Sequence, residues 1–447
     1  MNEEIQKYTE YCLNCPAKPC SNNGCPLNND IPAFIKQVKE GNIKEAYKIL
    51  SKTTVLGSVC GRICPHMKQC EGSCVRGIKG EPVNIGKIEA YVFDEALKNE
   101  WYKEIEKTKE LQGKNVAIVG GGPAGLTCAN FVARKGAKVV IYEKYNELGG
   151  ILSHGIPEFR LEKSVLKETI KSILNEGILD IKVEYGKELG KNLSLEELEN
   201  KYDAIFLSFG ANIPAKMNIE GEDLLGIFGG NSLLETGKHP SYAGKKVAVI
   251  GGGNVAMDCA RTIKRLGADK VFVIYRRAEK QMPAERKEIE EAKEEGIEFL
   301  FQNNIVKILG KGKVEKIECI KTELIKKEGE TREVPVNIEN SNYELEMDYV
   351  VMAVGGGPEK DIINSLGLEL NKWGYINVDE NHKTSKDKIY AGGDLAGDKG
   401  TVAWAARAGR EVAETIWKTE TRGHTICSNF ETNCVSPCSS SFIYLIQ

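Results

Sequence analysis

The stretch NVAIVGGGPAGLTCANFVARKGAKVVIYEK, residues 115–144, decides the fold, and KVAVIGGGNVAMDCARTIKRLGADKVFVIYRR, residues 246–277, repeats its pattern. Each reads as an apolar strand, a glycine turn, a helix and a second strand. In the first turn Gly120 makes the tight bend, Gly122 lets the backbone approach a pyrophosphate, and Gly125 lets the helix pack closely on the strand. The repeat therefore predicts two dinucleotide-binding sites, with a pair of merely glycine-rich turns as the alternative. The expected contacts at the two turns are Gly120, Gly122, Pro123, Ala124 and Gly125, then Gly251, Gly252, Gly253, Asn254, Val255 and Ala256.

The ends of the second strands separate the two ligands. The first strand ends in Glu143, followed by Lys144, and an acid at this position hydrogen-bonds ribose hydroxyls. The second strand ends in Arg276 and Arg277, and an arginine fork pairs with a 2′-phosphate that an acid would repel. The first site therefore suits FAD or NAD and the second suits NADP(H). A solvated strand end is the alternative interpretation of the two arginines.

Later segments favour FAD at the first site. Residues 388–416, KIYAGGDLAGDKGTVAWAARAGREVAETI, resemble the late segment of flavoproteins that carry two dinucleotide-binding domains. In those proteins the aspartate matching Asp394 contacts the ribityl–phosphate region of the flavin. Short Val/Ile-rich strands alternate with helical patterns throughout residues 111–418. We therefore expect an α/β fold with two Rossmann-like domains, in which the NADP domain is inserted into the FAD domain near residues 235–360.

Composition narrows the partners and the compartment. The chain has 61 Lys and Arg against 64 Asp and Glu, which argues against nucleic acid as the main partner. Its apolar runs are shorter than the roughly 18–20 residues that span a bilayer, and its first residues lack a secretory signal pattern. We therefore expect a cytoplasmic protein, in which clustered cysteines indicate metal binding or catalysis more often than disulfides. Cys128 and Cys259, single cysteines on predicted helices, are interpreted as core residues.

Eight of the 14 cysteines lie in residues 1–110, in two groups. The groups read Cys12-x2-Cys15-x4-Cys20-x4-Cys25-Pro26 and Cys60-x3-Cys64-Pro65-x4-Cys70-x3-Cys74. Short cysteine spacings followed by proline are typical of iron–sulfur ligation, and zinc is the rival interpretation. An electron carrier suits a chain that binds a flavin and NADP(H), which favours iron–sulfur clusters. Between the groups, residues 28–50 predict two short helices, with Asp30 as a cap and a break at Gly41 and Asn42.

Together these motifs resemble a known family. The stretches that resemble the small subunit of NADPH-dependent glutamate synthase are residues 12–15, 25–35, 60–89, 149–163, 251–268 and 275–288. They are also similar to the N-terminal half of dihydropyrimidine dehydrogenase and to the large subunit of NADH-dependent ferredoxin:NADP oxidoreductase. The resemblance covers roughly residues 8–418 and implies two [4Fe–4S] clusters in a helical N-terminal domain.

The resemblance also implies interleaved ligand sets for the two clusters. One cluster would take Cys12, Cys15, Cys20 and Cys74. The other would take Cys25, Cys64, Cys70 and a carboxylate, Glu89, which is a harder ligand and shifts the reduction potential. The sequence departs from the family in having four residues rather than three between Cys20 and Cys25, and Cys60 is available as a spare thiol. An exposed helix carboxylate is the alternative for Glu89.

Further nucleotide contacts carry over from the same resemblance. The flavin contacts would be Gly150, Ile151, Arg160, Gly393, Asp394, Thr401 and Val402. The nicotinamide-nucleotide contacts at a strand end would be Ala353, Val354 and Gly355, and residues 281–285, QMPAE, resemble a loop close to that nucleotide. The expected segments are a cluster domain (1–110), an FAD domain in two parts (111–235 and 359–418), an NADP domain (236–358) and a polar, disordered tail (419–447). Cys427, Cys434 and Cys438 fall in this tail, which is a less suitable metal site than the two cysteine groups.

These expectations combine into an electron-transfer function. NADPH would pass a hydride to FAD, a step that needs ring orientation and no acid or base, and single electrons would then reach the clusters. The family resemblance implies a glutamate synthase small subunit in a hetero-oligomer, delivering electrons to a larger catalytic subunit or a ferredoxin-type acceptor. A bifurcating NADP-binding subunit of the ferredoxin:NADP oxidoreductase type, and a non-catalytic electron-transfer or docking subunit, are the alternatives.

Overall fold

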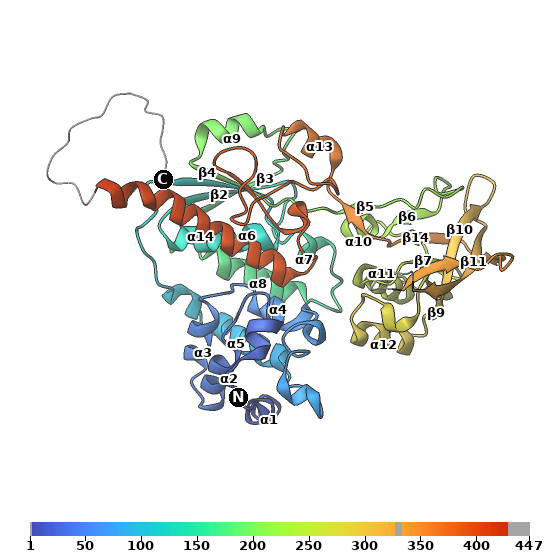
Figure 1. Cartoon of the computed structure of the whole chain (residues 1–447), viewed down its shortest axis with the longest axis horizontal. Coiled ribbons are helices and arrows are strands. Elements are labelled where there is room, and N and C mark those ends of the chain that lie inside the picture. The colour runs from blue at the N-terminus through green and yellow to red at the C-terminus, as the bar shows by residue number, and fades with distance from the viewer. Residues whose placement is uncertain (1, 327–332, 428–447) are drawn as a thin grey trace, which may run out of the picture.

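Two five-stranded parallel sheets of similar topology form the two nucleotide-binding halves of the chain (Figure 1). The computed structural model describes residues 2–326 and 333–427, without the side chains of residues 422–427. The first sheet has the order β16-β4-β1-β2-β3. β16, which comes after the second half in the chain, therefore pairs with β4, which comes before it. Its strands are β1 (Asn115–Val119), β2 (Lys138–Glu143), β3 (Ile181–Tyr185), β4 (Ala204–Leu207) and β16 (Ile389–Ala391).

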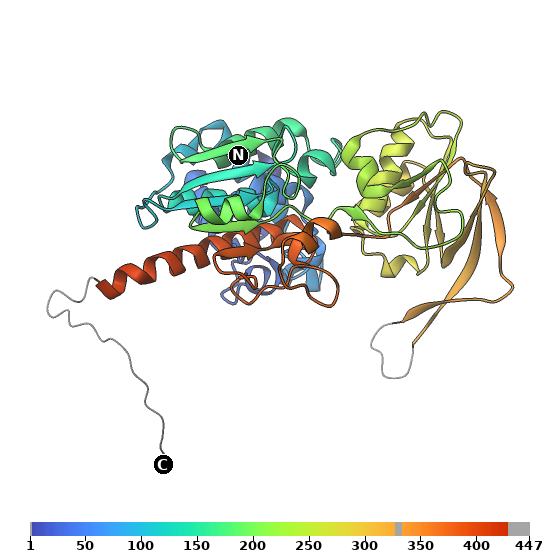
Figure 2. The ribbon, with the colours of Figure 1, turned by 90° about the horizontal axis from the view of Figure 1, so that it is seen from above.

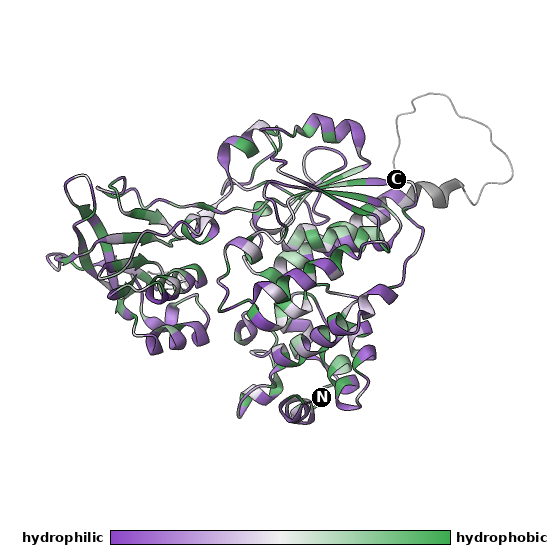
Figure 3. Cartoon of the chain, turned by 180° about the vertical axis from the view of Figure 1, so that it is seen from behind, coloured by the Kyte–Doolittle hydropathy of each residue, from purple (hydrophilic) through white to green (hydrophobic). Residues whose placement is uncertain are grey.

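Two helices pack against each other beside the first sheet. α6 (Pro123–Arg134) follows the first glycine turn, and α14 (Val402–Cys427) crosses it. A Cβ at Gly409 of α14 would lie 2.1 Å from the Ala124 carbonyl oxygen, so glycine is required for this close approach. In Figure 3 the strands are hydrophobic, whereas the outer helix α9 is mostly hydrophilic. The remaining helices of this half are α7 (Ile151–His154), α8 (Lys163–Leu174), α9 (Leu195–Lys201), α13 (Lys360–Ser365) and η6 (Gly393–Ala396).

The second parallel sheet has the order β6-β14-β7-β8-β9. The chain enters and leaves this half through β5 (Ile213–Pro214) and β15 (Gly356–Gly357), which pair antiparallel. Because β6 pairs with β14, residues 227–229 belong to this second sheet, earlier in the chain than the expected boundary at residue 235. The elements are β6 (Ile227–Gly229), α10 (Gly230–Thr236), β7 (Lys246–Ile250), α11 (Asn254–Arg265), β8 (Lys270–Tyr275), η5 (Glu279–Gln281), α12 (Arg286–Glu294), β9 (Glu298–Phe301) and β14 (Tyr349–Met352).

An antiparallel sheet extends from the second half and projects to one side in Figure 2. It consists of β10 (Asn303–Leu309), β11 (Lys316–Ile325), β12 (Val334–Asn337) and β13 (Tyr343–Glu346). On β11, buried residues such as Ile317 and Cys319 alternate with more exposed ones, as a sheet with one covered face requires. Ile317 packs in the same apolar cluster as Val350 of β14, which attaches this sheet to the nucleotide-binding half.

The N-terminal segment is helical and packs beneath the first half. Asp30 caps α2 by accepting a hydrogen bond from the Ala33 amide, and Asn42 precedes α3, so the two predicted helices are confirmed. Arg134 of α6 donates to the Ser51 carbonyl oxygen over 2.7 Å and thereby joins the two regions. The elements are α1 (Glu3–Tyr11), η1 (Cys20–Gly24), α2 (Ile31–Lys39), α3 (Ile43–Leu50), α4 (Gly57–Ile63), η2 (His66–Lys68), η3 (Val75–Ile78), α5 (Ile85–Lys98) and η4 (Trp101–Glu104).

The C-terminal end differs from the expected tail. α14 continues through residue 427, so residues 419–427 are helical and the expected start of a structureless tail at residue 419 is wrong. The reason is that contacts with the first sheet continue past Ile416, since Glu420 pairs with Lys114 at 2.6 Å, and that no proline interrupts the helix. Cys434 and Cys438 lie outside the described residues, as does the side chain of Cys427. Within the described part of the chain, no helix combines the length and apolarity needed to cross a membrane.

Candidate active site and iron–sulfur ligands

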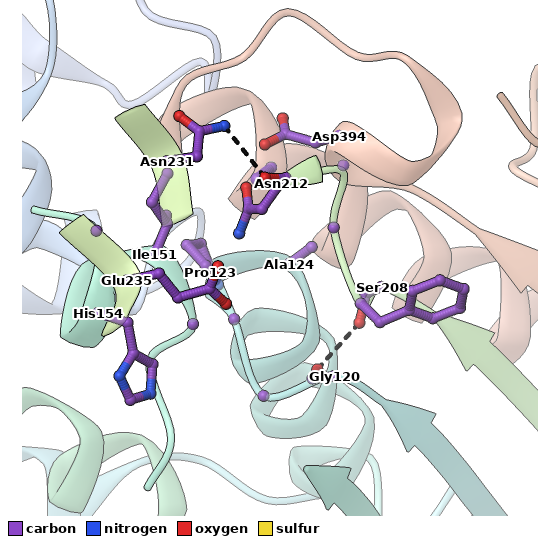
Figure 4. Close-up of a pocket in the computed structure, with 18 of the residues that line it drawn as sticks. Gly120, Pro123, Ala124, Ile151, His154, Ser208, Asn212, Asn231, Glu235 and Asp394 are labelled. Atoms are coloured by element: carbon purple, nitrogen blue, oxygen red, sulfur yellow. Dashed lines mark hydrogen bonds between the residues drawn. The ribbon is translucent and has the colours of Figure 1, made fainter. Parts of the chain in front are cut away.

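A cavity of about 290 Å³ lies where the first nucleotide-binding half meets the other two parts of the chain. This volume is close to the lower end of typical ligand pockets, about 300 Å³. All the expected flavin contacts except Gly125 line it, from the glycine turn through Asp394 to the start of α14. Figure 4 shows Asp394 and Asn212 near one end of this cavity and His154 at the other.

The first glycine turn explains why these residue types occur in this order. Gly120 has φ +102°, and a Cβ there would lie 2.7 Å from the Phe209 Cα. A Cβ at Gly125 would lie 2.0 Å from the Gly120 carbonyl oxygen, so Gly125 serves packing and lies behind the cavity wall. A Cβ at Gly122 would meet no atom within 4 Å, so its space is open to a ligand. This is the arrangement in which backbone N–H groups at a helix start approach a pyrophosphate.

Glu143 is fixed at the end of β2 by backbone groups. Its Oε2 accepts from the Gly121 amide over 2.8 Å and its Oε1 accepts from the Tyr145 amide over 2.9 Å. Each carboxylate oxygen has a second lone pair, so Glu143 retains capacity for two ribose hydroxyls. Asp394 lies at the opposite wall, where burial, and then Asp398, raise its pKa. Together the residues of the cavity wall fit the adenosine, pyrophosphate and ribityl parts of FAD.

Sequence reasoning missed several residues of this cavity. The Tyr145 ring packs against the His154 ring, with the centroids 4.3 Å apart and the planes tilted by 48°. The Tyr145 hydroxyl donates to Glu235 of α10. Asn231, also on α10, donates to the carbonyl of Asn212 over 3.5 Å (Figure 4). These contacts depend on how the second half sits against the first. A motif within either half carries no signal for them.

A buried ion network ties the two halves together beside the cavity. Arg160, an expected flavin contact, pairs with Asp258 of α11 at 2.9 Å and with Glu288 of α12 at 3.1 Å. Burial raises the pKa of Asp258 to about 6, although Arg160 lowers it. Arg261 also pairs with Glu288, and its guanidinium lies 4.5 Å from the centroid of the Phe159 ring. The Phe159–Arg160 segment therefore anchors the second half, in addition to lining the cavity.

The expected NADP contacts gather at the carboxyl ends of β7, β8 and β14, where ligands of parallel sheets bind. Asn254 accepts through Oδ1 from the Glu285 amide over 2.9 Å, which joins the QMPAE loop to the glycine turn. Arg276 is exposed, and the Nε of Arg277 is buried without a hydrogen-bond partner among the described residues. An unpaired buried donor at this position fits a 2′-phosphate acceptor. Asn254 and Val255 also line the flavin cavity, so the two nucleotide sites adjoin.

Four cysteines of the N-terminal domain surround a second, apolar cavity. Cys12, Cys15, Cys20 and Cys74 line it together with Ile31, Ile35, Val83 and Ile85. Burial, and then the neighbouring Cys74 and Cys12 thiols, raise the pKa of Cys20 to about 11. Such thiols stay protonated at neutral pH unless a metal displaces the proton. This is the same set that the family resemblance implies for the first cluster.

The extra residue between Cys20 and Cys25 is absorbed by a π-helical turn. Residues 20–24 form this turn, and the Cys25 amide donates to the Cys20 carbonyl oxygen over 2.8 Å. A π turn accommodates one residue more than an α turn, so both cysteines keep positions at the ends of a single turn. The departure from the family spacing therefore leaves each cysteine with its own group.

The second group of candidate ligands lies apart from the first, with Cys70 and Glu89 buried and Cys25 and Cys64 half-buried. Burial raises the pKa of Cys25 to about 12, with Glu89 as its next strongest influence, and Cys70 responds to Cys25, Glu89 and Cys64. Glu89 is 6% exposed, which excludes the alternative of a solvated helix carboxylate, and burial raises its pKa to about 8. Cys60 is 2% exposed and interacts with Cys64, so it is a fifth candidate in this group.

Thiolates and a carboxylate around a closed site are a donor set that fits iron–sulfur ligation. Within the described residues, no three His, Cys, Asp or Glu side chains meet at the spacing of a single metal ion. The first group of four cysteines shares one apolar cavity, as the ligands of a single cluster must, whereas the second group lines no such cavity among the described residues. Cys128 and Cys259, by contrast, are fully buried among apolar side chains, so their interpretation as core residues is confirmed.

The second ligand group adjoins the flavin cavity. Ile63 and Pro65, on either side of Cys64, both line that cavity. Val402, in the first turn of α14, also faces the cavity, and the backbone of the next residue, Ala403, is among the groups that act on the pKa of Cys64. The sequence carries no signal for Ile63 and Pro65 as cavity residues beyond their position next to Cys64.

Comparisons with known proteins agree with this organisation. Residues 114–411 match the pyridine nucleotide-disulphide oxidoreductase family, and residues 1–101 match domain II of dihydropyrimidine dehydrogenase, a 4Fe-4S cluster domain. Among solved structures, FprA of Mycobacterium tuberculosis in complex with NADPH has a TM-score of 0.62 at 19% identity, covering 71% of this chain and 87% of FprA. At this identity the likeness shows the fold, and the expected fold class is confirmed.

Relatives found by sequence are more similar to this chain than FprA is, at 36% against 19% identity. The glutamate synthase [NADPH] small chain of Halomonas elongata is 36% identical over 91% of this chain and 88% of its own length. That of Escherichia coli is 36% identical over 92% of this chain and 91% of its own length. With the family matches, these relatives confirm the expected oxidoreductase class and its FAD, NADP(H) and [4Fe–4S] cofactors. The chain belongs to the family of the NADPH-dependent glutamate synthase small chains.

Proposed function

We propose that this chain takes electrons from NADPH and delivers them to a larger redox subunit, as the small chain of a glutamate synthase. The observation that carries the proposal is the position of Ile63 and Pro65, which flank Cys64 and line the flavin cavity. The wall of the flavin site and the ligand loop of a cluster are thus the same piece of chain. Electrons that reach the flavin therefore have a buried, direct route into the N-terminal domain.

The bound groups supply the redox chemistry: FAD accepts a hydride from NADPH, and iron–sulfur clusters accept electrons singly. The chain's own residues orient and separate these groups. Glu143 and the amides after Gly120 would hold the adenosine and pyrophosphate of FAD, and Arg276 with Arg277 would hold the 2′-phosphate of NADPH. The adjoining cavities bring the two rings together, and orientation supplies most of the catalysis.

We further propose two clusters in a fixed order. Cys25, Cys64, Cys70 and Glu89 would hold the cluster next to the flavin. Cys12, Cys15, Cys20 and Cys74 would hold the outer one, because Leu13 and Val75, which line their cavity, are 50% and 38% exposed. The order is therefore from the flavin cavity to the protein surface.

The surface over the outer cluster suits a protein partner. Four apolar side chains near the outer ligands are exposed, and we name them the exit patch: Tyr11, Leu13, Val75 and Ile78. Arg76 stacks on Tyr11 at 4.2 Å and gives the patch a basic edge. Exposed apolar groups gathered at a redox group mark an interaction site, here for the larger catalytic subunit of a hetero-oligomer. We propose a cytoplasmic location for this assembly.

A Cys20→Ala variant tests the proposal when compared with the unmodified chain. Protein purified without oxygen should contain about eight iron and eight sulfide ions per chain, and the variant about four of each. NADPH should still bleach the FAD of the variant, because hydride transfer needs ring contact at about 3–3.5 Å and no cluster. Turnover with the physiological partner should fall steeply. A variant that retains FAD but is not reduced by NADPH would refute the order of carriers, and stoichiometric zinc in the unmodified chain would refute the clusters.

A further inference from the structure

A continuous chain of hydrogen bonds joins α14 to Glu89. Arg410 of α14 donates from Nη1 to the carbonyl oxygens of Leu27, over 2.8 Å, and Thr53, over 2.9 Å. The Thr53 hydroxyl donates to Asn29 Oδ1 over 2.6 Å, and Asn29 Nδ2 donates to Glu89 Oε1 over 3.1 Å. Asn29 is 1% exposed and Arg410 is 8% exposed, so the chain runs through the interior.

The chemistry of the groups fixes the direction of every bond in this chain. A carboxylate that ligates a cluster is ionised and only accepts, so with Glu89 as a ligand the amide nitrogen of Asn29 must face Glu89. The amide oxygen of Asn29 then faces Thr53, whose hydroxyl must donate. Asn29 therefore has one orientation and holds one of the two Glu89 oxygens in place, and Glu89 in turn acts on the pKa of each of Cys25, Cys64 and Cys70.

Arg410 adds a buried charge to this chain. It is bonded to Leu27, and the neighbouring Arg407 donates to the Pro26 carbonyl oxygen over 3.3 Å, so α14 holds the loop directly after Cys25. Arg410 also lies 3.8 Å from the half-exposed Glu414, which offsets part of its charge, and the Leu27 carbonyl that it bonds is two residues after Cys25. A fixed positive charge stabilises the more negative, reduced state of a nearby cluster and so raises its reduction potential.

We propose that Asn29 is a positioning residue that presents Glu89 to the inner cluster, and that Arg410 holds this arrangement and raises the potential of that cluster. The inference rests on the proposed function, because it presupposes an inner cluster ligated by Glu89. It goes further by assigning the orientation of that ligand, and the readiness of the cluster to accept an electron, to residues that are not ligands.

Arg134 provides a matched control for Arg410. It is a half-buried arginine that likewise joins the flavin half to the N-terminal domain, donating to the Ser51 carbonyl oxygen over 2.7 Å. Ser51 lies two residues from Thr53, so both arginines hold the same stretch of chain. Arg410 also donates to the Leu27 carbonyl oxygen, two residues after Cys25, whereas the bond of Arg134 ends at Ser51. Loss of Arg134 should therefore disturb docking without changing the potential of the inner cluster.

The test compares the unmodified full-length chain with Asn29→Asp, Thr53→Val, Arg410→Met and Arg134→Met, all purified without oxygen. Iron content, FAD content, the EPR spectrum after dithionite reduction and the midpoint potentials of the clusters are measured. An ionised aspartate matches asparagine in shape but cannot donate to Glu89 and repels it, so the EPR signal of the inner cluster should change and its iron should be lost to a chelator about 10- to 100-fold more readily. Thr53→Val should act in the same direction, more weakly.

Arg410→Met should retain both clusters and move the potential of the inner one to a more negative value, while Arg134→Met should leave it unchanged. The inference is overturned if Asn29→Asp and Thr53→Val keep the unmodified spectrum and chelator resistance, or if the two arginine variants shift the potential equally. If Asn29→Asp also loses FAD and has failed to fold, Thr53→Val and Arg410→Met decide by the same criteria. An unmodified chain with FAD but only one cluster signal would sink the proposed function, and the inference with it.

Discussion

Replacing Gly122 by alanine should remove FAD from an otherwise folded chain. Gly122 has φ −78° and ψ −172°, which alanine adopts without strain, and a Cβ there would meet no protein atom within 4 Å. That space is where the backbone approaches the pyrophosphate. Losing one charge-assisted hydrogen bond to a phosphate costs about 1.5–3 kcal/mol, and about 1.4 kcal/mol is a factor of ten in affinity. FAD binding should therefore weaken by about ten- to a hundredfold.

Gly125→Ala provides the contrast, because its Cβ would lie 2.0 Å from the Gly120 carbonyl oxygen in the core. Overpacking of this kind costs about 1–3 kcal/mol of folding free energy and should lower the unfolding temperature even without FAD. The assay titrates FAD into each apoprotein by flavin fluorescence and follows thermal unfolding by circular dichroism. Gly253→Ala is the matched control, since its nearest neighbour is a Pro283 carbon at 4.0 Å, and it should weaken NADPH and not FAD. The reasoning fails if Gly122→Ala binds FAD normally, or if it lowers the apoprotein's unfolding temperature as much as Gly125→Ala.

Three further changes test other parts of the site. Arg276→Glu should reduce or reverse the preference for NADPH over NADH in flavin reduction by at least about tenfold, because each charge-assisted contact is worth about 1.5–3 kcal/mol. Equal rates of flavin reduction with both coenzymes in the unmodified chain would contradict the assignment. Glu143→Ala should lower FAD retention while the NADPH affinity of flavin-loaded protein stays nearly constant, and the opposite result would mean that the two nucleotide sites are exchanged. Leu13→Glu in the exit patch should slow turnover with the partner subunit without changing flavin reduction by NADPH. Trp373→Glu, at a residue outside the exit patch that is 71% exposed, should change neither rate. Similar kinetics of both variants with the partner would rule out the patch.

The local elements and the lining of the flavin site could be predicted from the sequence because they follow from short-range rules. A glycine turn between strand and helix, as at Gly120, has one stable geometry, and the residues around it then fall into place. The cap at Asp30 is equally local, since a single side chain satisfies one free amide. Each of these features needs only a few consecutive residues.

The contacts between the parts could not be predicted in the same way. The pairing of Arg160 with Asp258 joins residues 98 positions apart, and no periodicity in either segment encodes it. The π turn at residues 20–24 could be noticed only as an irregular spacing, because it arises when an extra residue must fit between two fixed thiols. The helical residues 419–427 were interpreted as a polar tail because low hydrophobicity hides the continuation of a helix whose stability comes from its packed first turns.

α14 shows why the flavin domain includes a segment that follows the NADP domain in the sequence. Val402 lines the flavin cavity and Arg410 holds the loop after Cys25, and both residues lie on this one helix. From Val402 to Arg410 the helix rises about 12 Å, at about 1.5 Å per residue. Close packing at Gly409 against α6 fixes the helix along its length. The spacing between the flavin and the inner ligand group is therefore set by a rigid element rather than by a loop, so a substitution that disturbs α14 should affect the electron transfer between them before it affects either site alone.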